Sequence, residues 1–209
     1  MPLGQDEHLD VLFHTLQKIC HEENIDYRVI GGAAFYLHGR QRGTKDVDIE
    51  LLTQDRRQKL AAGFREIDDN VVKDHPDKGI MVKYKWGPGK HDFCGLDGKI
   101  APAEELDIWR EHFVIIQGYP VADLHVLLVT KIRAAASRRK WERPIKGVID
   151  IGDVRFCTYE LAQSGIKFDP STLPLITEEL YAEFLNRVEE EDRPIVVQAL
   201  QAIGFPRAE

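Results

Sequence analysis

The sequence predicts an α+β protein, with a mixed β-sheet flanked by helices over residues 1–120 and a helical region over residues 121–209 packed on that core. Two observations carry this prediction. Short runs in which apolar and polar residues alternate, the period of a strand, are confined to the first 120 residues. After Asp123, apolar residues recur every three or four positions, the period of amphipathic helices. A chain of 209 residues with 43% hydrophobic residues is large and apolar enough to bury a full core.

The first half alternates predicted helices and strands. Helices are predicted by helical periodicity at residues 9–20, 33–39 and 55–67, the second of them stopped by Gly39. Strands are predicted at residues 25–32, 46–52, 70–74, 79–86, 91–96 and 111–122, the last interrupted by Gly118 and Pro120. In the second half the predicted helices are residues 123–139, 150–165, 177–190 and 193–204. Asp123 and Asp192 are expected to cap the first and last of these four, and Gly165 to end the second.

Composition excludes several classes of function. The net charge of −7 disfavours non-specific nucleic-acid binding by the chain as a whole, although local basic patches remain open. The three cysteines are widely spaced and form no C-x-x-C, so we expect reduced thiols rather than a zinc knuckle or a disulfide framework. Neither a secretory signal nor an apolar run long enough to span a bilayer is evident, which favours a cytoplasmic protein that does not bind a membrane.

An acidic strand is the first feature that points to chemistry. In "DVDIELL" the side chains of Asp46, Asp48 and Glu50 leave the same face of the strand, roughly 7 Å from one to the next. Three like charges in a row repel one another, so a positive group is expected against them. Hard oxygen ligands without a nearby cysteine favour Mg²⁺ or Mn²⁺. A strand with one face in water shows the same alternation, so a merely solvated face remains an alternative.

Two glycines upstream favour the chemical interpretation. Gly31 and Gly32 follow a predicted strand and precede a predicted helix, where exposed backbone N–H groups can hold phosphate oxygens. Phosphate contacts and an acid pair that binds a metal belong to the same chemistry. The sequence contains no Walker A motif, no G-x-S-x-G, no G-x-G-x-x-G and no H-x-x-x-H, so other common catalytic arrangements are absent.

The stretch "GGAAFYLHGRQRGTKDVDIELL" resembles the active-site signature of the DNA polymerase β-like nucleotidyltransferase superfamily: a glycine turn, a short helix, then Asp-x-Asp on the next strand. Its second part is similar to the AbiEii/MenT-like small nucleotidyltransferases, in which R-x-T-x-D-h-D is a common spelling. Arg42, Thr44, Asp46 and Asp48 match that spelling residue by residue. The resemblance implies a nucleotidyltransferase fold for the first half of the chain.

The resemblance also implies further site residues. A third carboxylate on a neighbouring strand completes the metal site with Asp46 and Asp48; Asp92 is the first candidate, and Asp97 and Glu50 are its rivals. The segment "LLVTKIRAAASRRKWERPIKGVIDIGDV" matches a family helix whose lysine contacts the triphosphate, here Lys131. Asp150 and Asp153 match an acidic element on the following helix, and one of them is expected to pair with that lysine. The alternative for the lysine is a side chain that reaches out to water.

The implied reaction is transfer of a nucleoside monophosphate from an NTP to a hydroxyl or amine, with release of pyrophosphate and with Mg²⁺ or Mn²⁺ as cofactor. The implied acceptor is a tRNA, a protein or a small molecule. Asp46, Asp48, Asp92 and Lys131 are the catalytic candidates, and the nucleotide-binding candidates are Gly31, Gly32, Arg42, Thr44, Lys131 and Asp150. Two alternatives remain: a weakly active or inactive nucleotidyltransferase-like protein that binds nucleotide or a partner, and a structural interaction module.

Overall fold

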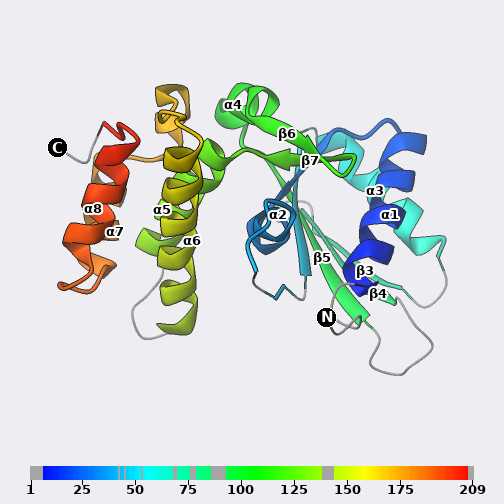
Figure 1. The fold of residues 1–209 in the computed structure, drawn as a ribbon. Helices are drawn as coiled ribbons and strands as arrows, with labels where there is room; N and C mark the ends of the chain where they lie inside the picture. Colours follow the sequence, from blue (N-terminus) through cyan, green and yellow to red (C-terminus); the bar gives the residue numbers. More distant parts are fainter. Residues whose placement is uncertain are drawn as a thin grey trace. The chain divides into compact units, whose positions relative to one another are not determined.

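The protein is described by a computed structural model, which defines residues 7–41, 43–44, 46–52, 54–67, 70–75, 79–85, 93–137 and 144–206. The chain forms two compact units, Met1–Ala122 and Asp123–Glu209. All strands of the described part belong to the first unit, and the second is helical (Figure 1). The predicted α+β class, a mixed sheet flanked by helices and followed by a helical region, is confirmed.

The first unit is built on a seven-stranded sheet in the order β3-β4-β5-β2-β1-β7-β6. The sheet is mixed, because β2 pairs parallel with β5 and β1 parallel with β7, whereas the other neighbours are antiparallel. The acidic strand β2 therefore lies inside the sheet, hydrogen-bonded along both edges. The strands are β1 (Tyr27–Ile30), β2 (Asp46–Leu51), β3 (Val71–His75), β4 (Gly79–Lys85), β5 (Phe93–Ile100), β6 (Phe113–Ile116) and β7 (Tyr119–Ala122).

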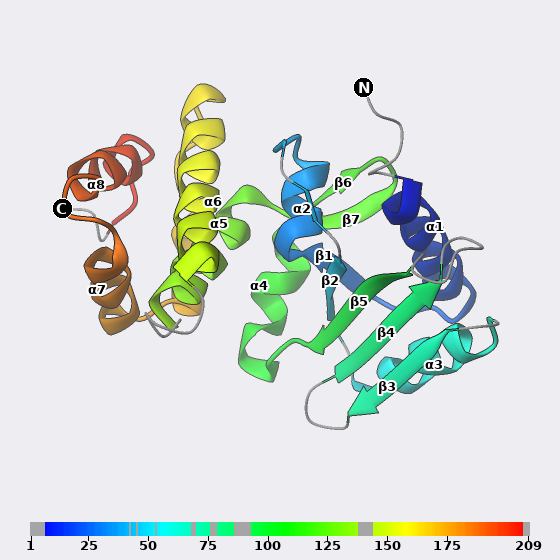
Figure 2. The same cartoon turned by 90° about the horizontal axis from the view of Figure 1, so that it is seen from below.

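Helices cover the two faces of this sheet unequally. Helices α1 (Glu7–Glu22) and α3 (Gln54–Arg65) lie on one side, and the short α2 (Gly31–Leu37) lies on the other, against β1 and β2 (Figures 1 and 2). The apolar positions of α1 recur at helical spacing and are buried. They share the core with Val47, Ile49 and Leu51, the aliphatic face of β2, all of which are fully buried. Burial of one face of β2 turns its acidic face toward the opposite side of the sheet.

Residues 111–122 were predicted as one interrupted strand; residues 113–122 instead form a hairpin of β6 and β7, and Glu111 ends the preceding helix α4 (Leu106–Glu111). Gln117 and Gly118 connect the strands, and both have positive φ, 53° and 87°. Two such residues make a turn whose twist matches that of a hairpin, and glycine adopts this conformation at no steric cost. The prediction located the break at Gly118 correctly but missed that the chain reverses there, because Gln-Gly is a weaker hairpin signal than Asn-Gly.

The short helices α4 (Leu106–Glu111) and η1 (Ala103–Glu105) were not predicted. Their sequence, "AEELDIWRE", offers only one large apolar side chain that becomes fully buried, so it shows no periodicity. That side chain is Trp109, which is 1% exposed and whose indole N–H donates to Glu105 Oε2 at 3.2 Å. Tertiary packing of one residue, rather than local pattern, fixes this segment.

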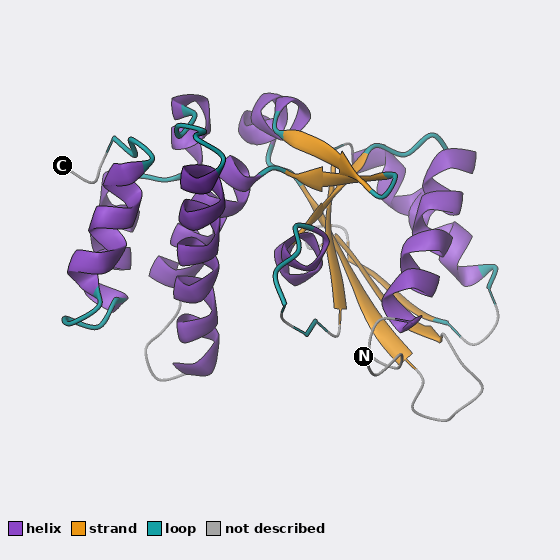
Figure 3. Cartoon of the chain, viewed as in Figure 1, coloured by secondary structure: helices purple, strands orange, loops and turns teal. Residues whose placement is uncertain are grey.

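The second unit contains α5 (Leu124–Ser137), α6 (Pro144–Gln163), η2 (Pro170–Leu175), α7 (Glu178–Arg187) and α8 (Arg193–Ala202) (Figure 3). Helix α5 packs against α6 and α7, and α8 packs against α6. Asp123 caps α5 as predicted, since its Oδ1 accepts from the backbone N–H groups of His125 and Val126, each at 3.0 Å. The side chain of Asp192, also predicted as a cap, makes no capping hydrogen bond.

Helix α6 starts six residues before the predicted position, at Pro144 instead of residue 150. Proline is favoured in the first turn of a helix because the missing N–H would have no intrahelical partner there. Gly165, with φ of 65°, follows the end of α6 as predicted. In the part of the chain that the structure defines, no helix combines the length and the apolar character needed to cross a bilayer.

Candidate active site

The register of the sheet places the acids of β2 in cross-strand rows with residues of other strands. Asp48 is level with Asp97 of the parallel neighbour β5 and with Ile30 of β1. Residues that are level in adjacent strands have side chains on the same face, with Cα atoms about 4.8 Å apart. Asp48 and Asp97 therefore present two carboxylates side by side, and each is partly exposed. Like charges at this separation are unfavourable unless a cation is shared between them.

Glu50, a rival for the third carboxylate, has different neighbours. It is level with Arg28 on β1 and with Lys99 on β5, so a cation flanks it on each side. Its side chain is buried, 8% exposed, whereas Asp46 at the other end of the strand is exposed. The guanidinium of Arg28 lies 3.9 Å from the ring centre of Phe113 and donates to the Tyr27 carbonyl. The two flanking cations, Arg28 and Lys99, indicate a structural role for Glu50. Asp97 is therefore the better candidate to bind a metal ion together with Asp48.

Two of the predicted site residues, Arg42 and Asp92, lie outside the described residues. Within the described part, no three His, Cys, Asp or Glu side chains converge in a group that could hold a metal ion. Of the predicted carboxylates, Asp48 and Asp97 are level on neighbouring strands. Asp46 lies two residues before Asp48, on the same face of β2. Sequence reasoning named Asp97 as a rival but missed the role of Arg28 and Lys99 in separating Glu50 from this pair.

Gly31 allows the start of α2 to lie close to Asp48, because it has no side chain. It has a φ of 62° and begins α2 directly after β1, and a Cβ atom there would collide with Asp48 Oδ2. Only glycine meets both requirements, because other residues rarely adopt this φ and carry the Cβ that collides. The side chain of Ile30, which precedes α2, makes no capping hydrogen bond to the first-turn amides. Gly32 follows in the first turn and is buried.

Replacing Gly31 by alanine is therefore expected to damage the site beyond its effect on the backbone. The positive φ costs about 1–2 kcal/mol of stability, and the new methyl group pushes the Asp48 carboxylate out of position. We expect loss of Mg²⁺-dependent stabilisation by NTPs in a thermal-shift titration. The matched control is Gly39→Ala, since Gly39 has a φ of 90° with nothing within 4 Å of a Cβ. Equal loss of the NTP response in both variants would contradict the role given to Gly31.

Thr44 lies beside the acidic strand and orients it. Its hydroxyl donates to the Asp46 carbonyl at 2.9 Å and is 3.3 Å from Asp46 Oδ1. A hydroxyl has one proton to give, and in this arrangement it is directed at Asp46. Thr44 thus positions the start of β2.

Lys131 is held by two aspartates inside the second unit. Its Nζ lies 3.1 Å from Asp150 Oδ1 and 2.8 Å from Asp153 Oδ2, so α5 is tied to α6 by a buried ionic group. The Lys131 side chain is 12% exposed, and those of Asp150 and Asp153 are 2% and 0% exposed. The expected pairing with an aspartate is confirmed, and both candidates take part. One ammonium between two carboxylates leaves a formal charge of −1 on the group.

Cys20 and Cys94 do not offer a nucleophile at neutral pH. All three cysteines of the chain are free and buried. Burial, with a smaller contribution from Asp26, raises the pKa of the Cys20 thiol to about 12, and burial likewise raises the pKa of Cys94 to about 12. Thiols with such pKa values are protonated at physiological pH, and the thiolate is the reactive form.

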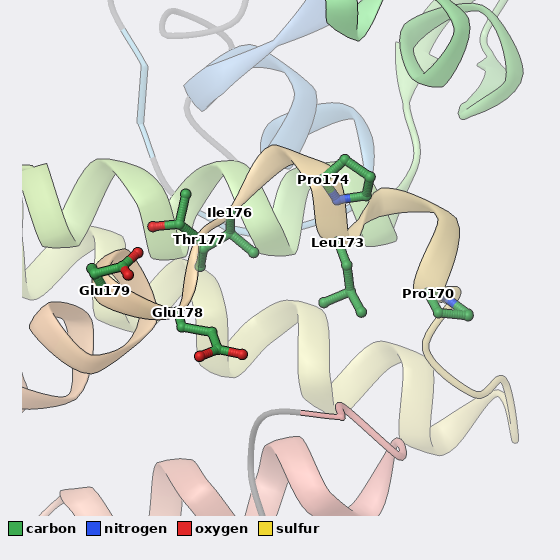
Figure 4. Close-up of a pocket in the computed structure, with 7 residues that line it drawn as sticks. All are labelled: Pro170, Leu173, Pro174, Ile176, Thr177, Glu178 and Glu179. Carbon is green, nitrogen blue, oxygen red and sulfur yellow. The ribbon is translucent and has the colours of Figure 1, made fainter.

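An open pocket of about 540 Å³ in the second unit is lined by none of the predicted site residues named above (Figure 4). Its lining is mainly apolar, with two prolines, Leu173 and Ile176 beside two glutamates from the first turn of α7. Thr177, which also lines it, accepts from the Leu180 N–H as the cap of α7. Among the described residues that line this pocket there is no lysine, arginine, histidine or cysteine.

Comparison with solved structures identifies the fold. An antigenic nucleotidyltransferase-like protein from Paracoccidioides brasiliensis matches with a TM-score of 0.64 and 21% identity, over 97% of this chain and 95% of that one. The fold is nucleotidyltransferase-like. ANT(2")-Ia, solved in complex with adenylyl-2"-tobramycin, matches this nucleotidyltransferase-like fold with a TM-score of 0.51 and 21% identity, over 84% and 96% of the two chains. JHP933 from Helicobacter pylori matches it with a TM-score of 0.55 and 17% identity, over 94% and 79%. No protein-family model and no curated protein sequence matches the chain.

Proposed function

We propose that the protein is a metal-dependent nucleotidyltransferase that moves a nucleoside monophosphate from an NTP to an acceptor hydroxyl or amine. The acceptor oxygen or nitrogen forms a bond to the α-phosphorus, the bond from that phosphorus to the bridging oxygen breaks, and pyrophosphate leaves. The observation that supports this proposal most directly is the pair Asp48 and Asp97, level on parallel strands of a nucleotidyltransferase-like fold. No covalent intermediate on the protein is needed, because phosphoryl transfer depends mainly on positioning and charge stabilisation.

The donor set fits Mg²⁺ or Mn²⁺. Both side chains of the pair offer carboxylate oxygens, which hard cations prefer, and no thiol stands level with them in the neighbouring strands. Mg²⁺ usually takes one or two protein carboxylates and completes its octahedron with water and substrate phosphates. Two aspartates, with Asp46 or Asp92 as a further ligand, are sufficient for such a site. When bound, the ion supplies a lowered pKa for the attacking group and neutralises charge on the phosphates.

The remaining residues position the nucleotide in this proposal. Gly31 allows the backbone of α2 to lie against Asp48. In the proposal, the backbone N–H groups of the first turn of α2, including that of Gly32, bind the phosphates. Thr44 fixes Asp46, and Arg42, which precedes Thr44 by two residues in the sequence, is proposed as a further phosphate ligand. The contact of Lys131 with the triphosphate stays a prediction from the resemblance, and it would require the ammonium to be shared with Asp150 and Asp153.

A nucleotide-binding protein with little or no turnover is the second candidate. It is favoured by the finding that no three carboxylate or imidazole groups converge among the described residues. Such a protein would bind an NTP with Mg²⁺ but transfer its nucleotide slowly.

Both candidates are tested by one pair of measurements. We expect thermal-shift stabilisation by at least one NTP that is lost when EDTA removes the metal, and label transfer from α-phosphate-labelled NTPs to an acceptor in cell extract. Stabilisation without any label transfer would select the binding protein. A protein that no NTP stabilises in the presence of Mg²⁺ would contradict both.

A further inference from the structure

Strand β6 forms one edge of the sheet and carries only apolar residues. Its sequence is Phe-Val-Ile-Ile, and the sheet order places it last, with β7 as its one neighbour among the described strands (Figure 2). Phe113, Val114 and Ile115 are 36%, 40% and 63% exposed. A run of exposed apolar side chains on an edge strand is a template for pairing with another strand, because the outer backbone groups have no partner there.

The opposite edge of the same sheet is protected against such pairing. Strand β3 is the last strand on that side, and the exposed charge of its Lys73 opposes association with another chain. Strand β6 contains neither a charged residue nor a proline, which are two common forms of edge protection. The proline of its hairpin, Pro120, lies on β7 instead. Protection of one edge and not of the other indicates that a partner covers β6.

Pro120 fixes which backbone groups of β6 point outward. Ile115 is level with Pro120, which has no N–H, so these two residues cannot exchange the hydrogen bonds of a hydrogen-bonded antiparallel pair. Hydrogen-bonded and non-hydrogen-bonded pairs alternate along antiparallel strands, so Phe113, two residues earlier, forms a non-hydrogen-bonded pair as well. The N–H and C=O groups of Phe113 and Ile115 thus point away from β7. Among the described residues, no strand pairs with them from that side.

We propose that β6 pairs antiparallel with β6 of a second copy of this chain, about a two-fold axis at Val114. In this register Phe113 of each copy is level with Ile115 of the partner subunit. These two pairs use all of the outward N–H and C=O groups of Phe113 and Ile115 in both strands. A two-fold axis at Ile115 would instead place Phe113 level with Gln117 of the partner subunit, in the turn of the hairpin, and would leave outward groups unpaired.

The chemistry of β6 favours its own copy as the partner. The edge requires an apolar, uncharged strand with a free edge, and β6 of a second copy is such a strand. Phe113 beside Ile115 is a favourable cross-strand combination of an aromatic and a β-branched residue, and Val114 meets its own copy at the axis. A preformed strand also loses less conformational entropy on pairing than a disordered peptide does.

The interface is small, and it joins two sheets into one. A paired segment of four residues is far below the roughly 20–30 residues a side of a standard interface, so we expect a reversible dimer with a Kd of about 10 μM or weaker. The two-fold axis is perpendicular to the sheet, so the acidic faces of both β2 strands lie on the same side of the joined sheet. Formation of the dimer does not depend on the proposed function.

The test uses charge at the two-fold axis. Val114→Lys and Val114→Glu each place like charges level with one another in the dimer, whereas a mixture of the two chains places opposite charges there. Sedimentation velocity at protein concentrations up to about 500 μM measures association. We expect each variant alone to dimerise at least about tenfold more weakly than wild type, and the mixture to recover dimer formation. The matched control is Val71→Lys on the edge strand β3, where valine is 51% exposed; it should associate like wild type.

Hydrogen exchange tests the same register without any substitution. In wild type, exchange of the Phe113 and Ile115 amides should slow as protein concentration rises. The amides of Val114 and Ile116, which point toward β7, should exchange at a rate that changes less with concentration.

Recovery in the mixture supports the proposal, because it requires residue 114 of one copy to meet residue 114 of the other. Wild type that stays monomeric at every concentration would overturn it, as would equal weakening by Val71→Lys. Weakening by both Val114 variants without recovery in their mixture would overturn the two-fold register. Exchange at Phe113 and Ile115 that is independent of concentration would contradict the pairing even if a variant failed to fold.

Discussion

Asp48→Asn is expected to lower nucleotidyl transfer by roughly 10³-fold while leaving the protein folded. The substitution removes the charge of one of two level carboxylates, and loss of about 4 kcal/mol of transition-state stabilisation by a bound cation corresponds to that factor. Stability without Mg²⁺ should be unchanged or slightly higher, because the repulsion between Asp48 and Asp97 is relieved. Label transfer from NTPs and urea unfolding with and without Mg²⁺ measure the two effects.

Variants of the neighbouring acids sharpen this prediction. Asp97→Asn should resemble Asp48→Asn in both measurements, since the two residues are level on adjacent strands. Glu50→Gln should differ, because Glu50 is buried between Arg28 and Lys99. It is expected to lower stability and to leave the response to Mg²⁺ in place. A Glu50 variant that abolishes the Mg²⁺ response while Asp97→Asn retains it would assign the third carboxylate to Glu50.

Lys131→Met is expected to lower the free energy of unfolding of the second unit by about 3–5 kcal/mol. Methionine matches the length of lysine but leaves Asp150 and Asp153 buried together without their cation. Urea denaturation monitored by circular dichroism measures the loss. The control is Lys146→Met on α6, an exposed lysine whose replacement should change stability by less than about 0.5 kcal/mol.

A compensated variant separates the structural role of Lys131 from a role in nucleotide binding. Lys131→Met combined with Asp150→Asn and Asp153→Asn removes all three charges and should recover most of the stability, because no buried charge is left unpaired. If its NTP affinity is also that of wild type, Lys131 serves the fold alone. Weaker NTP binding by this folded variant would support contact between Lys131 and the triphosphate.

The sequence predicted most elements because local patterns dominate in them. The alternation of acids and aliphatic residues in β2, and the spacing of Leu12, Leu16 and Ile19 in α1, reflect burial of one face, which the structure confirms. The segment 103–111 was missed because its helices depend on burial of Trp109 by distant residues. The early start of α6 was missed because "ERPIKG" carries a proline that can equally well begin a helix or a turn.

The candidate site could be predicted only along one strand. Asp46 and Asp48 share a face because of the two-residue period, and this follows from sequence alone. The choice among Asp92, Asp97 and Glu50 depends on the register between β2 and β5, whose paired residues are 49 positions apart in the chain. A shift of one residue would move every side chain of β5 to the other face. Strand pairing also places Arg28, Glu50 and Lys99 level with one another on three adjacent strands, and no local sequence pattern predicts this.

The interior position of β2 has a consequence for how this protein can change. Freeing its aspartates would require breaking hydrogen bonds to β1 and β5 at once, so these positions share the slow, global opening of the first unit rather than the fast local fluctuations of loops. Adaptation to a new acceptor is therefore expected to occur by remodelling of the exposed strands β3 and β4 and of the connecting segments. Strand β2, the proposed metal-binding strand, would keep its position while the surface around it diversifies.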